Sequence, residues 1–139
     1  MNGQDELTRY MALIEHYKEQ MNALDMQISY VHAAINDYNK AKMTLENISK
    51  ASKNDEILLP IGGSTFIHAN PTDPSKVLFD IGAGLVAEKA TSDAIKKIDE
   101  RIKDLQKTMD KLSTMMQQMQ EEATDISMKA QNLMSQGGQ

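Results

Sequence analysis

The feature that most constrains this chain is a seven-residue repeat of apolar residues, which runs along each of two long segments. In the first segment one row is Leu7, Ile14, Met21, Ile28, Ile35 and Lys42, and the other is Tyr10, Tyr17, Leu24, Val31, Tyr38 and Leu45. Apolar residues at alternating spacings of three and four form one stripe along a helix, and a long stripe is typical of a coiled coil. A repeat slightly shorter than two full helical turns predicts a left-handed supercoil.

The second segment carries the same repeat near the other end of the chain. One row is Ile98, Leu105, Leu112, Met119, Ile126 and Leu133, and the other is Ile95, Ile102, Met109, Met116, Ala123 and Ala130. The residues between the rows are mostly polar in the middle of this segment, so that face is predicted to be solvated. A helix with an apolar stripe needs a partner in water, and the other segment is the simplest one.

Glycine and proline divide the chain into three parts. Residues 4–52 and 91–136 contain neither, whereas residues 56–89 contain all three prolines and four of the seven glycines. We therefore predict a helix, a turn-rich middle and a second helix over these three ranges. Together they are expected to form a single domain of residues 1–139.

The two helices are predicted to pair in antiparallel orientation, because the chain reverses between them. A register is proposed in which the numbers of facing residues sum to 140. Every facing pair except Lys42–Ile98 then consists of two apolar residues or of tyrosine with an apolar residue. This register also places Tyr10 opposite Ala130 and Tyr17 opposite Ala123. Large residues then face small ones, as a seam of constant width requires.

Two β-hairpins are predicted in the middle part. Gly62-Gly63 separates the first pair of β-forming runs, and Gly82-Ala83-Gly84 separates the second pair, which is a signal for tight turns. The second helix is predicted to begin with Thr91 or Ser92 as its N-cap. The predicted strands are residues 57–61, 65–69, 77–81 and 85–87.

These four short strands cannot cover their own apolar side chains, because an isolated hairpin is marginally stable in water. Open strand edges also invite pairing with another chain. We therefore predict that the strands form an oligomerisation element; the alternative is that they fold back on the helix ends and bury themselves. The predicted oligomerisation residues are Ile57, Leu59, Ile61, Phe66, Ile67, Val77, Leu78, Phe79, Ile81, Leu85 and Val86.

Charge and composition argue against several classes of function. A formal net charge of −5 disfavours nucleic acids and anionic membranes as partners. Cysteine is absent, and His16, His32 and His68 lack the spacing of metal ligands, so we expect no metal site. No phosphate-binding loop is present, and we expect neither an enzyme nor a cofactor. No secretory signal or membrane-spanning run is visible, which favours a cytoplasmic location.

Near the two free helix ends, apolar residues also occupy positions outside the seam rows. Met11 and Leu13 lie beside the seam in the first helix, and Met128 and Met134 do so in the last. Antiparallel pairing brings these ends together, so this tip would carry more apolar surface than a two-helix seam can bury. Exposed apolar patches mark binding sites, and methionine adapts to varied partners. The predicted binding residues at the tip are Leu7, Met11, Leu13, Met128, Leu133 and Met134.

The order of helix, two hairpins and helix resembles the prefoldin family over the whole chain. Four strands rather than two resemble the alpha class of subunit. The most specific stretches are Leu59-Pro60-Ile61-Gly62-Gly63 with Phe66-Ile67-His68-Ala69, and Val77-Leu78-Phe79-Asp80-Ile81-Gly82-Ala83-Gly84 with Glu88-Lys89.

This resemblance implies a mainly α fold with a small β segment, in which an antiparallel two-helix coiled-coil hairpin is joined by two β-hairpins that oligomerise into a β-barrel platform. It also implies an archaeal-type hexamer of two alpha and four beta subunits. Its tips would hold unfolded polypeptides without ATP and deliver them to a group II chaperonin. The family has no tip motif, so the tip residues depend on the distribution of apolar residues alone. The alternative function is a structural coiled-coil scaffold or tether, which needs no excess apolar surface at its free end.

Overall fold

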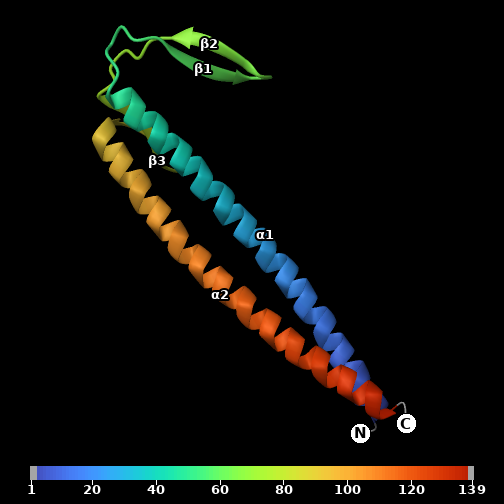
Figure 1. The fold of residues 1–139 in the computed structure, drawn as a ribbon. Coiled ribbons are helices and arrows are strands. Elements are labelled where there is room, and N and C mark those ends of the chain that lie inside the picture. Colours follow the sequence, from blue (N-terminus) through green and yellow to red (C-terminus); the bar gives the residue numbers. More distant parts are fainter. Residues whose placement is uncertain (1–2, 138–139) are drawn as a thin grey trace. The chain divides into compact units, whose positions relative to one another are not determined.

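The computed structural model describes residues 3–137, so the ends of the predicted domain of residues 1–139 (Met1, Asn2, Gly138 and Gln139) lie outside the described part. Along the chain, two long helices flank four strands, in the order α1, β1, β2, β3, β4, α2 (Figure 1). This order confirms the predicted mainly α fold with two hairpins between two helices. The elements span Gly3–Ser49, Ile57–Gly62, Thr65–Ala69, Lys76–Gly82, Leu85–Ala90 and Thr91–Gly137.

Helix α1 ends at Ser49, before the predicted end at Ser52. The hydrogen-bond spacing shortens to three residues there: the backbone N–H of Ala51 donates to the carbonyl of Ile48 at 2.9 Å. Such three-residue spacing is common where α-helices end. The N–H of Ser52 then donates to the carboxylate of Asp55 at 2.7 Å, which holds the turn that leads to β1.

Helix α2 begins at Thr91, one of the two predicted positions. The side chain of Thr91 does not cap the helix, however, because its hydroxyl donates to the carbonyl of Pro74 at 2.8 Å. Its backbone N–H donates to the carbonyl of Ser75, also at 2.8 Å. The buried Thr91 therefore ties the start of α2 to the loop that precedes β3.

Both hairpins turn in the same way. Strand β1 pairs antiparallel with β2, and β3 with β4, so the described strands form two separate two-stranded sheets. The φ angles are 57° at both Gly63 and Ser64, and 52° and 75° at Ala83 and Gly84. Two successive residues with positive φ are typical of the type I′ turn, whose twist suits a hairpin. The predicted turns are confirmed, and the barrel platform stays a prediction because these two sheets do not close into one.

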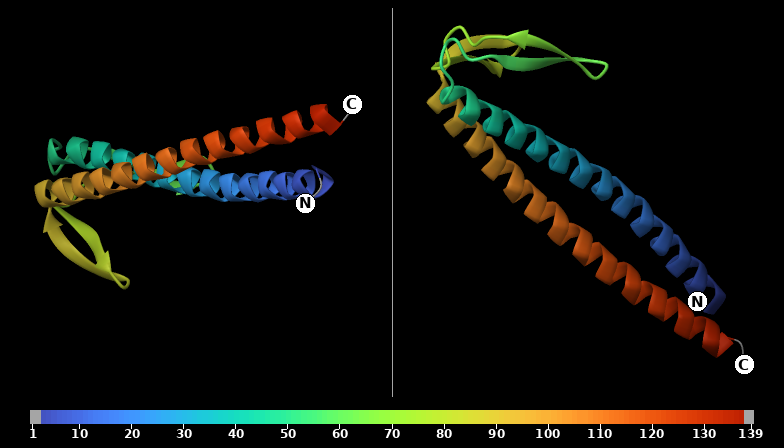
Figure 2. Two further views of the ribbon diagram at one scale, coloured as in Figure 1. Left: turned by 90° about the horizontal axis from the view of Figure 1, so that it is seen from below. Right: turned by 45° about the horizontal axis from the view of Figure 1, so that its top comes forward.

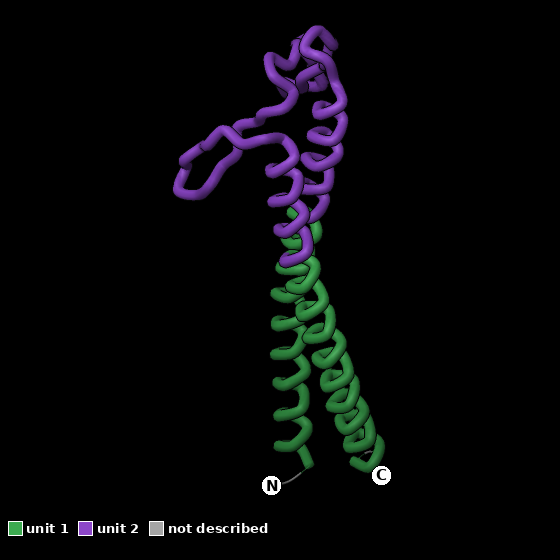
Figure 3. The backbone as a smooth tube through the Cα atoms, turned by 90° about the vertical axis from the view of Figure 1, so that its left-hand side faces the viewer, with its two compact units in different colours: residues 1–34, 105–139 green, residues 35–104 purple. Residues whose placement is uncertain are grey.

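The chain divides into two compact units (Figure 3). We call residues 1–34 and 105–139 the terminal unit, because it contains both chain ends. We call residues 35–104 the hairpin unit, because it contains all four strands. The single domain of residues 1–139 stays a prediction.

The predicted seam is on the covered side of both helices. Every residue of the four predicted rows is buried or half-buried. Most are only half-buried, because a single partner helix covers an apolar stripe from one side. The most deeply buried of them are Leu24, Ile98, Ile102, Leu112 and Ala130.

Contacts beside the seam confirm the predicted antiparallel register to within one residue. In the terminal unit the hydroxyl of Tyr17 donates to Glu122 at 2.8 Å, next to its predicted partner Ala123. In the hairpin unit Lys42 Nζ lies 2.7 Å from Asp99 Oδ1. The hydrogen bond to Asp99 raises the pKa of Lys42. The charge that interrupts the repeat is therefore paired, and a single lysine in a seam can specify register.

Candidate protein-binding surfaces

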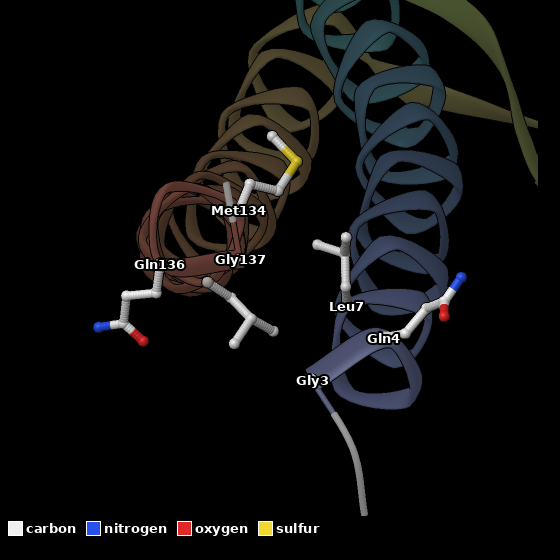
Figure 4. Close-up of a pocket in the computed structure, with 7 residues that line it drawn as sticks. Gly3, Gln4, Leu7, Met134, Gln136 and Gly137 are labelled. Carbon is white, nitrogen blue, oxygen red and sulfur yellow. The ribbon is translucent and has the colours of Figure 1, made fainter. Parts of the chain in front are cut away.

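The first candidate surface lies at the free helix ends of the terminal unit. The start of α1 and the end of α2 lie side by side, because the seam pairs the helices as far as these ends (Figures 1 and 2). A pocket of about 550 Å³ lies between them (Figure 4). Its lining residues are Gly3, Gln4, Leu7, Leu133, Met134, Gln136 and Gly137.

Three of the predicted tip residues meet in this pocket. Leu7 and Leu133 are half-buried and come from different helices, and Met134 is 55% exposed. Figure 4 shows the Leu7 side chain directed toward the end of α2. These residues give the pocket an apolar lining that is open to solvent.

The other three predicted tip residues lie outside the pocket. Met11 and Met128 are 60% and 58% exposed, and Leu13 is exposed by 36%. They extend the exposed apolar surface along the helices, away from the chain ends. We call these six residues the tip surface. Their role in binding stays a prediction.

The pocket also has lining residues that sequence reasoning missed. Gly3, Gln4, Gln136 and Gly137 are small or polar, so they lack the apolar character that was used to find the site. Only their position at the two helix ends could have indicated them.

Exposed apolar side chains are not confined to the tip. Met26 and Tyr30 on α1 are 64% and 77% exposed, and with Ala33 they line a shallow hollow of about 360 Å³. The sequence did contain a signal, because residues four apart on a helix lie on the same face and these are outside the seam rows. The expectation that apolar residues outside the seam rows occur mainly at the tip is therefore corrected: Met26 and Tyr30 are also exposed along α1.

The second candidate surface is the apolar part of the hairpins. Leu58 and Leu59 are consecutive in β1 and both exposed, and successive strand residues point to opposite faces. The hairpin β1–β2 therefore presents apolar side chains on both faces. Eight of the predicted oligomerisation residues are exposed, namely Leu59, Ile61, Phe66, Ile67, Leu78, Ile81, Leu85 and Val86.

The remaining predicted oligomerisation residues, Ile57, Val77 and Phe79, are half-buried. The guanidinium of Arg101 on α2 lies 4.7 Å from the ring centroid of Phe79, and Lys89 Nζ lies 5.3 Å from it. A cation over an aromatic face is attracted by the charge distribution of the ring. Phe79 therefore contacts its own chain rather than facing solvent.

Neither surface contains an arrangement suited to metal chemistry. Within residues 3–137 no group of three or more His, Cys, Asp or Glu is placed to hold a metal ion. His68 contacts Glu56 at the base of β1–β2, where both side chains are exposed. No helix in the described part of the chain has an apolar stretch long enough to cross a membrane. Both surfaces consist mainly of exposed apolar side chains.

Comparison with known proteins identifies the family. Residues 17–136 match the family model for prefoldin subunits. The chain is 29% identical to the prefoldin subunit alpha of Archaeoglobus fulgidus, over 91% of this chain and 92% of the relative. It is 31% identical to the prefoldin subunit alpha of Methanococcoides burtonii, over 81% of this chain and 83% of the relative.

A solved structure agrees with this result at the level of the fold. The chain is similar to one in the cryo-EM structure of filamentous PFD from Methanocaldococcus jannaschii, with a TM-score of 0.71 and 21% sequence identity. The match covers 83% of this chain and 95% of the other. Together, the family match, the archaeal relatives and the helix–hairpins–helix fold show that this chain belongs to the prefoldin family of chaperones, as a subunit of the alpha type.

Proposed function

We propose that this chain is part of an ATP-independent holdase, which binds unfolded polypeptides with the tip surface and passes them to a group II chaperonin in the cytoplasm. The observation that carries the proposal is the pocket of about 550 Å³ lined by Leu7, Leu133 and Met134. Such a pocket is large enough for a bulky apolar side chain, the group that an unfolded chain exposes and a folded one buries.

The hairpins supply the assembly part of the proposal. Membership of the prefoldin family implies assembly with other prefoldin subunits. We infer that two copies of this chain combine with four beta subunits, and that the eight exposed strand residues pack into a shared β-barrel platform. The apolar character of both faces of β1–β2 supports this inference, because an exposed hairpin of this kind needs other strands to be stable.

Binding at one tip is expected to be weak. The pocket is open, and its flexible methionine adapts to many side chains without fitting one closely. Several tips that engage one client would multiply modest affinities, because later contacts form at a high effective concentration. Weak separate contacts also allow the client to leave without ATP.

The test is an aggregation assay on a denatured protein diluted from denaturant. We expect the variant Met128→Ser with Met134→Ser to need about five- to tenfold more protein for the same protection, since the two changes together remove apolar contact worth roughly 1 to 1.4 kcal/mol. The matched control is Met26→Ser with Met43→Ser, whose methionines are 64% and 65% exposed but lie outside the tip. This control should protect like the wild type.

A scaffold without client binding predicts that both double variants behave like the wild type. It also predicts that wild-type protein leaves aggregation unchanged, and that result would rule out the holdase. Protection by the wild type and equal protection by both double variants would instead rule out Met128 and Met134 as binding residues. Transfer is tested by adding a group II chaperonin and ATP to the protected client. We expect native client to form, and the absence of refolding would remove the transfer step from the proposal.

A further inference from the structure

The net charge of this chain is unevenly distributed. Residues 3–25 and 115–137, the outer parts of the two helices, contain eight Asp and Glu but only three Lys and Arg. Residues 26–114 contain twelve of each kind. The whole formal net charge of −5 is therefore located in the same segments as the tip surface.

The acidic residues are displaced from the pocket along the helices. Near the pocket, Asp5 and Glu6 are balanced in number by Arg9 and Lys129. Farther from the chain ends there are six exposed acidic residues and one cation, Lys18. We call these six the acidic collar: Glu15, Glu19, Asp25, Glu121, Glu122 and Asp125.

The distance between pocket and collar follows from helix geometry. Glu15 is eight residues from Leu7, and Asp125 is eight residues from Leu133. At about 1.5 Å per residue, these nearest collar residues are roughly 12 Å from the pocket along the helix, whereas Asp25, the farthest, is roughly 27 Å away. An extended polypeptide covers the shorter distance in about four residues, because it advances roughly 3.3 Å per residue.

We propose that the tip selects unfolded segments in which a bulky apolar side chain is accompanied, about four to six residues away, by lysine or arginine. The apolar side chain enters the pocket lined by Leu7, Leu133 and Met134, and the basic residues lie against the acidic collar. This inference rests on the proposed function and names the class of client that the tip surface takes.

The two parts of the site have different roles. The apolar lining supplies affinity without direction, because the hydrophobic effect depends on buried area. The collar adds attraction for cations, and several weak charge interactions at about 10 Å combine into a measurable preference. Exposed charges are screened over roughly 8–10 Å at physiological salt, so the preference should depend strongly on ionic strength.

The proposal is tested with unstructured fluorescent peptides and the full-length chain. All peptides carry the same Phe-Leu pair, and they differ only at two positions about four to six residues away, occupied by Lys, Ser or Glu. We expect the Lys peptide to bind about tenfold more tightly than the Glu peptide at low salt. At about 0.5 M salt the difference should shrink to roughly twofold.

Charge variants test whether the acidic collar causes the preference for the Lys peptide over the Glu peptide. Glu121→Gln with Asp125→Asn removes two collar charges, and we expect it to reduce the tenfold preference to about threefold. The control Asp37→Asn with Asp110→Asn removes two exposed charges outside the collar and should keep the full preference. Equal binding of the three peptides, or equal loss in control and collar variants, would overturn the proposal.

The same peptides separate this inference from the proposed function. If Met128→Ser with Met134→Ser weakens all three peptides alike and the wild type shows no charge preference, the holdase tip stands and the collar proposal falls. If no peptide binds the wild type, the proposed function fails and the collar proposal fails with it.

Discussion

The two β-hairpins share a backbone design but differ in their surroundings. Each is a two-stranded antiparallel sheet closed by a turn with two residues of positive φ. Hairpin β1–β2 exposes apolar side chains on both faces, including Leu58 and Leu59. Hairpin β3–β4 also exposes consecutive apolar residues, Leu85 and Val86, but its Phe79 contacts Arg101 of α2 instead of facing solvent.

Arg101 accounts for much of the difference. Its guanidinium stacks on Phe79 and donates to the carbonyl of Asp80 at 3.5 Å. It also donates to the hydroxyl of Tyr38 on α1 at 3.4 Å. One side chain therefore connects β3–β4 to both helices of the hairpin unit. In β1–β2, Leu59 stays exposed instead.

The two hairpins differ in how much of their packing comes from their own chain. A two-stranded hairpin needs further packing to be stable. Hairpin β3–β4 obtains part of that packing within its own chain, through the contact of Phe79 with Arg101. Under the proposed assembly, hairpin β1–β2 would find more of its packing partners in other subunits. Changes on the two hairpins should consequently affect assembly and local order differently.

The largest expected effect is on β1–β2. Leu59→Asp should weaken assembly with other prefoldin subunits by at least about 100-fold, because apolar contact is lost and a charge is buried in its place. Sedimentation velocity measures the assembly, and far-ultraviolet circular dichroism should show unchanged helix content. The control Met43→Asp changes an exposed methionine of the same unit and should assemble normally. If Leu59→Asp assembles like this control, β1 lies outside the interface.

A smaller effect is expected at the contact that distinguishes β3–β4. Arg101→Ala should increase amide hydrogen exchange in β3 and β4 by about tenfold, because a cation–π contact and its hydrogen bonds are lost. Exchange in β1 and β2 should stay unchanged. Lys103→Ala, an exposed position on the same helix, is the control. Equal acceleration in both hairpins would show that Arg101 does not account for their difference.

The smallest effect concerns the loop that joins the hairpins. The N–H and hydroxyl of Ser75 donate to the Asp73 carboxylate at 3.0 and 2.5 Å, and these bonds lower the pKa of Asp73 below its ordinary 3.8. A group with a lowered folded-state pKa stabilises above its unfolded pKa, and this contribution is lost as the pH falls through the folded value. The loop should therefore loosen below pH 3.8 while both hairpins remain paired.

This loosening can be followed by the NMR shift of the Ser75 amide. We expect an apparent pKa below 3.8 that disappears in Asp73→Asn. A midpoint at or above 3.8 would mean that the two bonds from Ser75 do not stabilise the carboxylate in solution.

The heptad rows by themselves determined the two helices, their antiparallel pairing and their register. A sustained seven-residue period leaves one way to cover the stripe, and the chain reversal sets the direction. The Tyr17–Glu122 contact lies where that register requires. The seven-residue repeat alone did not show how the charge of Lys42 is paired. Asp99 lies outside the seam rows, and only the tertiary structure shows that its carboxylate contacts Lys42 Nζ.

The sequence also determined that apolar residues such as Met11 and Met128 exceed what a two-helix seam can cover. It did not show that Leu7 and Leu133 line a pocket with Gly3 and Gln136, because a pocket is made by the spacing of two backbones. In the hairpins, strand alternation separates two faces but leaves open which side chains are covered. The tertiary structure decided that in β3–β4, because Arg101, distant in sequence, reaches Phe79 across the hairpin unit.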